Sequence, residues 1–389
     1  GSVIKQQLDR FSTRVCLDYF VSDRIKISTN FSMTYTKNQR NYDNLLALAY
    51  KKMPNMSIYE QDPITGADTD KYYQMLQTAP DVFKNDQRVY VNPVASANLA
   101  KNDDRTYDIT PEFELNYHLL GLDEESHQLN WQGRVYMNIF NEYVDMYYPS
   151  ELVTTSWKDG VNSSYAGSTK SVAFNTKQTL TFIPHFNNED HSLSMMGRFE
   201  LNSGTSSGQS NGAKLLPSGG IESPDAGGVN TGLASWYSQW RSMYFTYSMH
   251  YAYKGKYSID ATLRTDGSTS FGAGHKYGTF PSVGARWNIS DEKFMDWSDK
   301  WLSMLAFRPT WGVTGNTGGG TSDQYNKYSS QGYYAGHQVI KPENLSLTEL
   351  GREKTKQWNL GFNLGLLKDM LNFELEVYNK KTTDLLMNN

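Results

Sequence analysis

Apolar and polar residues alternate with a period of two along much of the chain. In the segment 25–35, Ile27 and Phe31 fall on one side, whereas Lys26 and Asn30 fall on the other. An extended backbone points successive side chains to opposite faces, whereas a helix repeats about every 3.6 residues. The segment is therefore predicted to be a strand with one apolar and one polar face.

The same alternation recurs and predicts about twelve strands, each near the nine to eleven residues that a tilted strand needs to cross a bilayer. These predicted strands lie near 11–19, 25–35, 107–117, 129–139, 172–182, 193–201, 243–251, 257–263, 279–289, 306–313, 358–366 and 371–377.

The connections between these strands alternate between short and long. Short links lie near 21–24, 118–128, 185–191, 253–256 and 367–370. Long links lie near 36–105, 140–171, 202–240, 266–278 and 314–354. The link at about 290–305 is intermediate, and Ser290-Asp291-Glu292 resembles a helix start. Outer-membrane barrels have short periplasmic turns and long extracellular loops.

We therefore predict an all-β fold, an antiparallel transmembrane β-barrel. Residues 1–389 would form part of one barrel domain, and the long links would be its extracellular loops.

Composition fits this prediction. Hydrophobic residues make up 38% of the chain and aromatic residues 14%, with 27 tyrosines, so a thin apolar band bordered by aromatic rings fits better than a deep aliphatic core. The net charge of −4 gives no basic footprint for nucleic acid, and the single cysteine, Cys16, excludes an intrachain disulfide. The alternative is a tyrosine-rich soluble β protein.

No catalytic, metal or cofactor site is predicted, and we expect a protein that is not an enzyme. The seven histidines are scattered, and none forms a zinc-protease pair with Glu. The acidic pairs Glu112/Glu114 and Glu374/Glu376 lie on polar strand faces, where a hydrated barrel lumen explains them better than glycoside hydrolysis. The acidic segment Asp62, Asp68 and Asp70 does not match the spacing of a calcium loop, and we interpret it as a solvated turn.

Aromatic residues within the long links are the candidate substrate-binding residues. Flat rings with polar edges, placed beside amide and carboxylate side chains, suit the recognition of sugars. The candidates are Trp157, Tyr165, Trp236, Tyr237, Trp240, Tyr325, Tyr328, Tyr333 and Tyr334. The alternative is that they belong to the aromatic girdle at the membrane interface or to loop packing.

Four blocks of sequence carry a resemblance to a known family. They are Tyr257–Gly272 with its continuation Tyr277–Trp287, Arg308–Asn316, Glu353–Phe362 and Leu371–Leu386. Together these blocks resemble the barrel of SusC/RagA-type TonB-dependent outer-membrane transporters. The first 240 residues match that family only in style.

The resemblance implies a barrel of about 22 strands in the bacterial outer membrane. It also implies an N-terminal plug, import energised by the TonB complex, and a SusD-like surface lipoprotein as a lid. The substrate would be an oligosaccharide or a peptide. We expect the chain to be an excerpt of such a transporter, without plug or terminal strands, because lipid does not tolerate the unpaired edges of an open barrel. A plugless porin or adhesin, and a secreted glycan-binding β protein, are the alternatives.

Overall fold

The computed structural model describes most of the chain. The described residues are 4–74, 87, 90–123, 125–152, 162–272, 274–298, 300–316, 324–344, 346 and 351–385.

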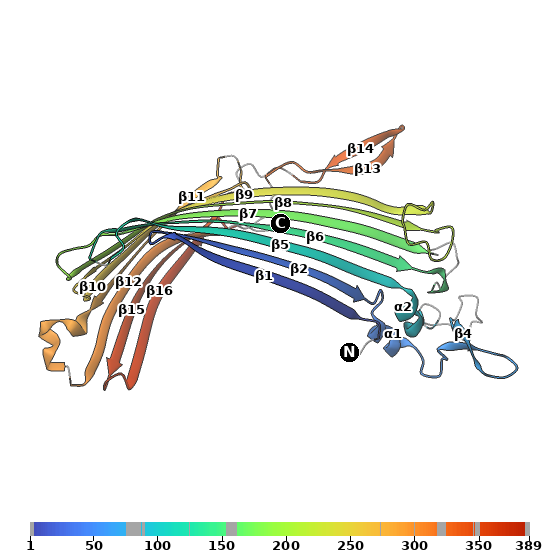
Figure 1. Ribbon diagram of the computed structural model, residues 1–389, viewed down its shortest axis with the longest axis horizontal. Helices are drawn as coiled ribbons and strands as arrows, with labels where there is room; N and C mark the ends of the chain where they lie inside the picture. Colours follow the sequence, from blue (N-terminus) through green and yellow to red (C-terminus); the bar gives the residue numbers. More distant parts are fainter. Residues whose placement is uncertain are drawn as a thin grey trace.

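One antiparallel sheet of twelve strands dominates the molecule, and it curves along its length (Figure 1). Consecutive strands of the sheet are neighbours throughout, with β1 and β16 at its two edges. The strands are β1 (Gln7–Ser22), β2 (Ile25–Arg40), β5 (Lys101–Leu120), β6 (Gln128–Tyr148), β7 (Ser163–Ile183), β8 (His191–Lys214), β9 (Val229–Tyr253), β10 (Tyr257–Ser268), β11 (Tyr277–Asn288), β12 (Leu302–Asn316), β15 (Glu353–Leu366) and β16 (Leu371–Thr383). The all-β antiparallel prediction and its twelve strands are confirmed.

Several strands run well past the ends that the alternation predicted. β8 continues through 202–214, and β9 begins at Val229, so both strands occupy part of the stretch predicted as a loop at 202–240. The β8 extension carries mostly Gly, Ser and Asn on both faces, and the β9 extension carries aromatic side chains on both faces, so neither has an apolar period to recognise. Strand pairing through Lys214–Val229 shows that the backbone continues its ladder without that period.

Short turns gather at one end of the sheet, which we call the short-turn end, and the long connections lie at the opposite, long-loop end. The link between β9 and β10 is a tight turn in which Lys254 has φ 53° and Gly255 has φ 66°. Two consecutive residues with positive φ match the right-handed twist of the flanking strands in a hairpin. This turn therefore fixes the register in which Tyr253 lies opposite Tyr257.

The cross-strand register sorts the side chains into two faces. On the apolar face, Phe31, Ile109 and Phe199 and their neighbours form a continuous band across the strands, and Leu17 is 65% exposed. Large apolar side chains left this bare on a whole sheet face indicate a surface built to meet a non-aqueous environment. We call this side the apolar face and the opposite side the polar face.

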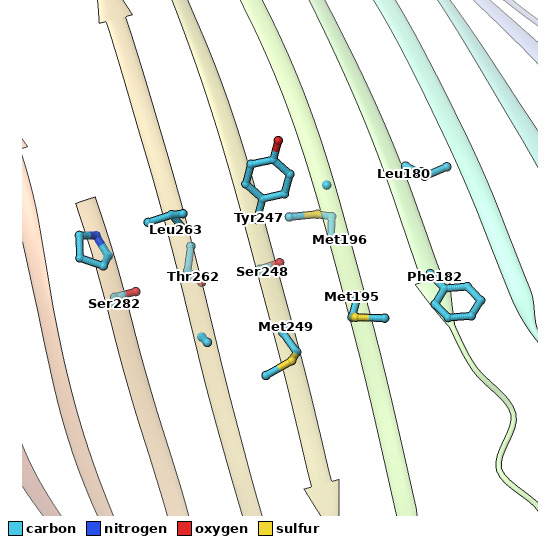
Figure 2. A pocket seen from close by; sticks show the side chains of 13 residues that line it. Leu180, Phe182, Met195, Met196, Tyr247, Ser248, Met249, Thr262, Leu263 and Ser282 are labelled. Atoms are coloured by element: carbon cyan, nitrogen blue, oxygen red, sulfur yellow. The ribbon is translucent and has the colours of Figure 1, made fainter. Parts of the chain in front are cut away.

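The apolar face is indented around Gly197. The groove there has a volume of about 580 Å³, and the side chains of Leu180, Met195, Tyr247 and Leu263 border it. Figure 2 shows these side chains rising from neighbouring strands, β7 to β10. The missing side chain at Gly197 opens this hollow between its larger neighbours.

At the long-loop end, the connection between β2 and β5 contains two short helices. The helix α1 (Leu45–Lys51) begins at Asn44, and α2 (Pro93–Leu99) begins at Asn92, whose side chain accepts hydrogen bonds from the first-turn amides. The helices contribute to a small buried cluster of Val91, Ala95 and Leu152. No helix in the described part of the chain has the length and apolar content needed to cross a bilayer.

Smaller hairpins also stand outside the main sheet. β3 (Tyr59–Gln61) pairs with β4 (Asp68–Tyr72), and β13 (Tyr328–Tyr334) pairs with β14 (His337–Pro342). The β13–β14 hairpin projects beyond the sheet in Figure 1.

The intermediate link between β11 and β12 forms two 3-10 helices, η4 (Ile289–Asp291) and η5 (Lys293–Ser298). Between them, Glu292 accepts hydrogen bonds from the Tyr257 hydroxyl and from Trp287 Nε1, the latter at 3.2 Å. The rings of Tyr257 and Trp287 stack with their centroids 6.4 Å apart. One carboxylate thus holds the polar tips of an aromatic pair at the short-turn end.

Candidate functional site

Two tryptophans of β9 lie on the polar face, in the part of the sheet nearest the long loops. Trp240 is directly opposite Gly204 of β8, and Trp236 is directly opposite Gly208. A Cβ atom on Gly204 would lie 2.5 Å from Trp240 Nε1, and one on Gly208 would lie 2.4 Å from Trp236 Nε1. Each indole therefore lies across a glycine whose missing side chain makes room for it.

The two indoles remain accessible in this arrangement. Trp236 is 48% exposed and Trp240 is 37% exposed. They stand four positions apart on one strand, about 13 Å at ~3.3 Å per residue. That spacing offers two flat apolar platforms in a line on an otherwise polar wall.

Hydroxyl groups fill the wall beside the indoles. The Oγ atoms of Ser171 on β7 and Ser206 on β8 are 2.6 Å apart, and Ser206 lies between the two glycines that receive the indoles. Flat rings beside hydroxyl groups can stack on the apolar face of a ring or chain while its polar groups are hydrogen-bonded.

Tyr165 shares this face. It lies on β7 opposite Gly212, and a Cβ atom on Gly167 would lie 3.0 Å from its Oη. The register places Tyr165 further toward the long loops than Trp236. The structure thus brings together three of the predicted binding residues, Tyr165, Trp236 and Trp240, on one face of one sheet.

The other predicted aromatic residues lie elsewhere. Tyr237 points to the opposite face from Trp236 and Trp240, because successive side chains of a strand point to opposite faces. It is 67% exposed. The rest of the described candidates are exposed tyrosines of the β12–β15 connection, three of them in the projecting β13: Tyr325, Tyr328, Tyr333 and Tyr334. Trp157 lies outside the described residues.

Nearer the middle of the strands, the polar face carries a cavity that sequence reasoning missed. Six polar or charged residues line its volume of about 290 Å³: Arg198, Glu200, Asn202, Tyr244, Thr246 and Arg264. Arg264 stacks on the Tyr244 ring at 4.7 Å, and its Nε donates to Asp266 at 2.5 Å. Asn175 and Asn202 donate to the Glu200 carboxylate at 3.2 and 3.1 Å. The polar residues that line this cavity come from three adjacent strands, and only the register between those strands shows that the residues lie side by side.

Three of the four carboxylates considered for catalysis are in contact with guanidinium groups on the polar face. Arg134 Nε lies 2.8 Å from a Glu112 carboxylate oxygen. Arg308 contacts Glu374 and lies 3.5 Å from Glu376. These contacts agree with a hydrated wall in which carboxylates are balanced by guanidinium groups.

The acidic segment considered for calcium is a turn closed by its own backbone. The Asp62 carboxylate accepts hydrogen bonds from the amides of Ile64 and Thr65, both at 2.8 Å. The hydrogen bonds from Thr65 and Ile64 lower the pKa of this carboxyl. Within the described ranges, no group of three His, Cys, Asp or Glu residues is arranged to hold a metal ion.

Comparison with known proteins relates the chain to one group of receptors. It is 28% identical over 309 residues to the TonB-dependent receptor P39 of Formosa agariphila. This match covers 76% of this chain and 28% of that relative. It is 30% identical over 145 residues to the TonB-dependent receptor SusC of Bacteroides thetaiotaomicron. This match covers 36% of this chain and 14% of that relative. No family model matches the chain. The chain thus spans only 28% and 14% of the lengths of these two relatives.

Among solved structures, the fold is similar to that of the RagAB peptide transporter. The TM-score is 0.73 at 17% identity, and the match covers 98% of this chain and 41% of that chain. The predicted resemblance to SusC/RagA-type TonB-dependent transporters is confirmed by these similarities.

Proposed function

From this relationship to TonB-dependent receptors, we propose that the chain forms part of the barrel wall of a nutrient importer in a bacterial outer membrane. The apolar face would meet lipid, the polar face would line the lumen, and the long-loop end would be extracellular. Support comes from a continuous apolar band on one face and carboxylate–guanidinium pairs on the other, as at Glu112–Arg134. Import would draw on the TonB complex, with a SusD-like lipoprotein as a lid and without catalysis by this wall.

We propose an oligosaccharide as the substrate. The observation that carries this is the pair of indoles, Trp236 and Trp240. They lie across Gly208 and Gly204 on the polar face, beside two serine hydroxyl groups in contact. Sugar rings present an apolar face to an indole and hydroxyl groups to neighbouring serines. A peptide is the second candidate, because the RagAB protein of similar fold is named a peptide transporter.

The experiment compares Trp236→Ala and Trp240→Ala with Tyr237→Ala in the full-length protein. Binding is measured by calorimetry against panels of oligosaccharides and of peptides of matched length. We expect each tryptophan variant to weaken oligosaccharide binding about tenfold, since an aromatic contact contributes ~0.5–1.5 kcal/mol beyond its buried area. Tyr237 points to the opposite face, so its variant should bind as the parent does.

Three outcomes would contradict these proposals. Equal losses in all three variants would mean that the polar face is not the binding surface. Weaker binding of peptides alone would indicate that the substrate is a peptide and not an oligosaccharide. Uptake that survives collapse of the proton-motive force would instead indicate the porin alternative.

A further inference from the structure

Three lysines form a cluster on the apolar side of β15 and β16, close to the long-loop end. Lys356 lies directly opposite Lys381, and Lys354 is one position further along the same face, opposite Thr383. All three are exposed. Apolar side chains occupy the same face of these strands nearer the short turns, so the cluster stands at the margin of the apolar band.

The cluster is not neutralised by the strands around it. The acidic residues of β12, β15 and β16 are Glu353, Glu374 and Glu376, and the register places all of them on the polar face. Within the residues that the structure describes, no ion pair involves any of the three lysines. By contrast, Arg105, which also follows the apolar band on its strand, is paired with Asp145.

Two like charges directly opposite one another destabilise a sheet. Their Cβ atoms stand only about 4.5–5.5 Å apart in such a pair. An anion placed between Lys356 and Lys381 would turn this repulsion into attraction. The arrangement therefore calls for a negatively charged partner on this face.

The side chains that follow the lysines toward the short-turn end indicate which other chemical groups that partner has. Trp358 follows Lys356 on the same face and lies opposite Trp311 of β12. Leu360 and Phe362 come next, with Val377 and Leu375 opposite them on β16. Going from the long-loop end, the surface thus presents cations, then amphipathic rings, then bare aliphatic and aromatic groups.

We propose that Lys354, Lys356 and Lys381 bind the phosphate groups of a lipid headgroup in the extracellular leaflet. The acyl chains of that lipid lie along Leu360, Phe362 and Val377. A free phosphate would use the lysines alone and leave the ordered apolar surface below them without a role. The proposal rests on the outer-membrane location proposed above.

The test uses the full-length protein in detergent micelles and fluorescent bisphosphorylated lipid A as the probe, with dephosphorylated lipid A as its partner probe. A lysine near an anionic lipid surface contributes about fivefold in affinity. Lys381→Gln should therefore bind lipid A about fivefold more weakly, and the triple variant Lys354→Gln/Lys356→Gln/Lys381→Gln about a hundredfold more weakly. Lys380→Gln is the matched control, because the adjacent residue points to the polar face, and it should bind as the parent does.

The proposal is overturned if the triple variant binds lipid A as tightly as the parent, or if Lys380→Gln loses as much as Lys381→Gln. It is also overturned if phosphorylated and dephosphorylated lipid A bind equally, which would leave an acidic polypeptide as the occupant. Circular dichroism and membrane flotation confirm that each variant is folded and in its membrane. A parent protein absent from the outer-membrane fraction would contradict the proposed function, whereas parent-like lipid binding by a correctly located triple variant contradicts only this inference.

Discussion

The two halves of β8 and β9 pair through one continuous ladder but differ in side-chain chemistry. In the lower half, 193–201 with 243–251, the apolar face carries Met195 opposite Met249 and Phe199 opposite Phe245. In the upper half, 202–214 with 229–242, serine, glycine and asparagine lie on both faces. Backbone pairing therefore does not require the apolar alternation. In the proposed barrel wall, the alternation would mark only the part of each strand that has lipid on one side and water on the other.

We expect the largest difference in stability between the two halves when a charge is placed on the apolar face. We expect Met249→Lys in the lower half to reduce the free energy of unfolding by about 2–4 kcal/mol, because an ammonium group must leave water for hydrocarbon. Ser235→Lys, on the same face and strand in the upper half, should change it by less than about 0.5 kcal/mol. Urea unfolding of the full-length protein in lipid vesicles measures both. Equal losses would mean that lipid covers the upper half as well.

The glycines of the upper half provide the next test, because two of them receive the indoles. In Gly204→Val, the new side chain would occupy the place of Trp240 Nε1, which lies 2.5 Å from a Cβ at that position. We expect oligosaccharide affinity to fall about tenfold as the indole is displaced, with a loss of about 1 kcal/mol in stability. Binding calorimetry and urea unfolding measure the two effects.

Gly232→Val is the control for that substitution. A Cβ at Gly232 has no atom within 4 Å, and valine favours an extended backbone. Affinity and stability should therefore stay near the parent values. If Gly232→Val weakened binding as much as Gly204→Val, displacement of Trp240 would not be the cause.

The difference between the two halves also explains which parts of the fold can be predicted from the sequence. Twelve strands could be placed from alternation because each crosses the apolar band, and the short turns predict which of them pair as hairpins. The extensions at 202–214 and 229–242 could not be placed, because neither of them has one apolar and one polar face. Their glycines and serines have the composition of a loop.

The candidate site was predictable in kind but not in arrangement. Trp236 and Trp240 were recognisable as candidates, and their spacing of four puts them on one face of any strand. Their seating on Gly208 and Gly204 depends on the register between β8 and β9, which the intervening residues do not encode in a visible pattern. The polar cavity around Glu200 was missed for the same reason, since its residues come from three strands.

Charges on the polar face of β12 and β16 should matter less than a charge on the apolar face of β9. Arg308→Ala removes the partner of Glu374 and Glu376, which then repel one another two positions apart on β16. These groups are partly exposed, so we expect a loss of only about 0.5–1 kcal/mol, which 1 M salt should remove by screening. Lys380→Ala, on the same face with no ion pair among the described residues, should have no measurable effect. A loss above about 2 kcal/mol would show that this face is dry rather than hydrated.

The smallest effect is expected at the short-turn end, beyond both halves of the strands. The Tyr257 hydroxyl and then Trp287 donate to Glu292, and these hydrogen bonds lower the pKa of its carboxyl below 4.5. A carboxyl whose pKa is lowered by folding contributes stability above its unfolded pKa and loses it as pH falls through the folded pKa. The parent protein should therefore lose a small stabilisation as pH falls below about 4.5, and Glu292→Gln should lack that part of the pH dependence. Part of the Glu292 side chain is accessible to water, so the difference should shrink further in high salt. Urea midpoints measured from pH 3 to pH 7 test this, and identical pH profiles for parent and variant would show that Glu292 does not hold the aromatic pair.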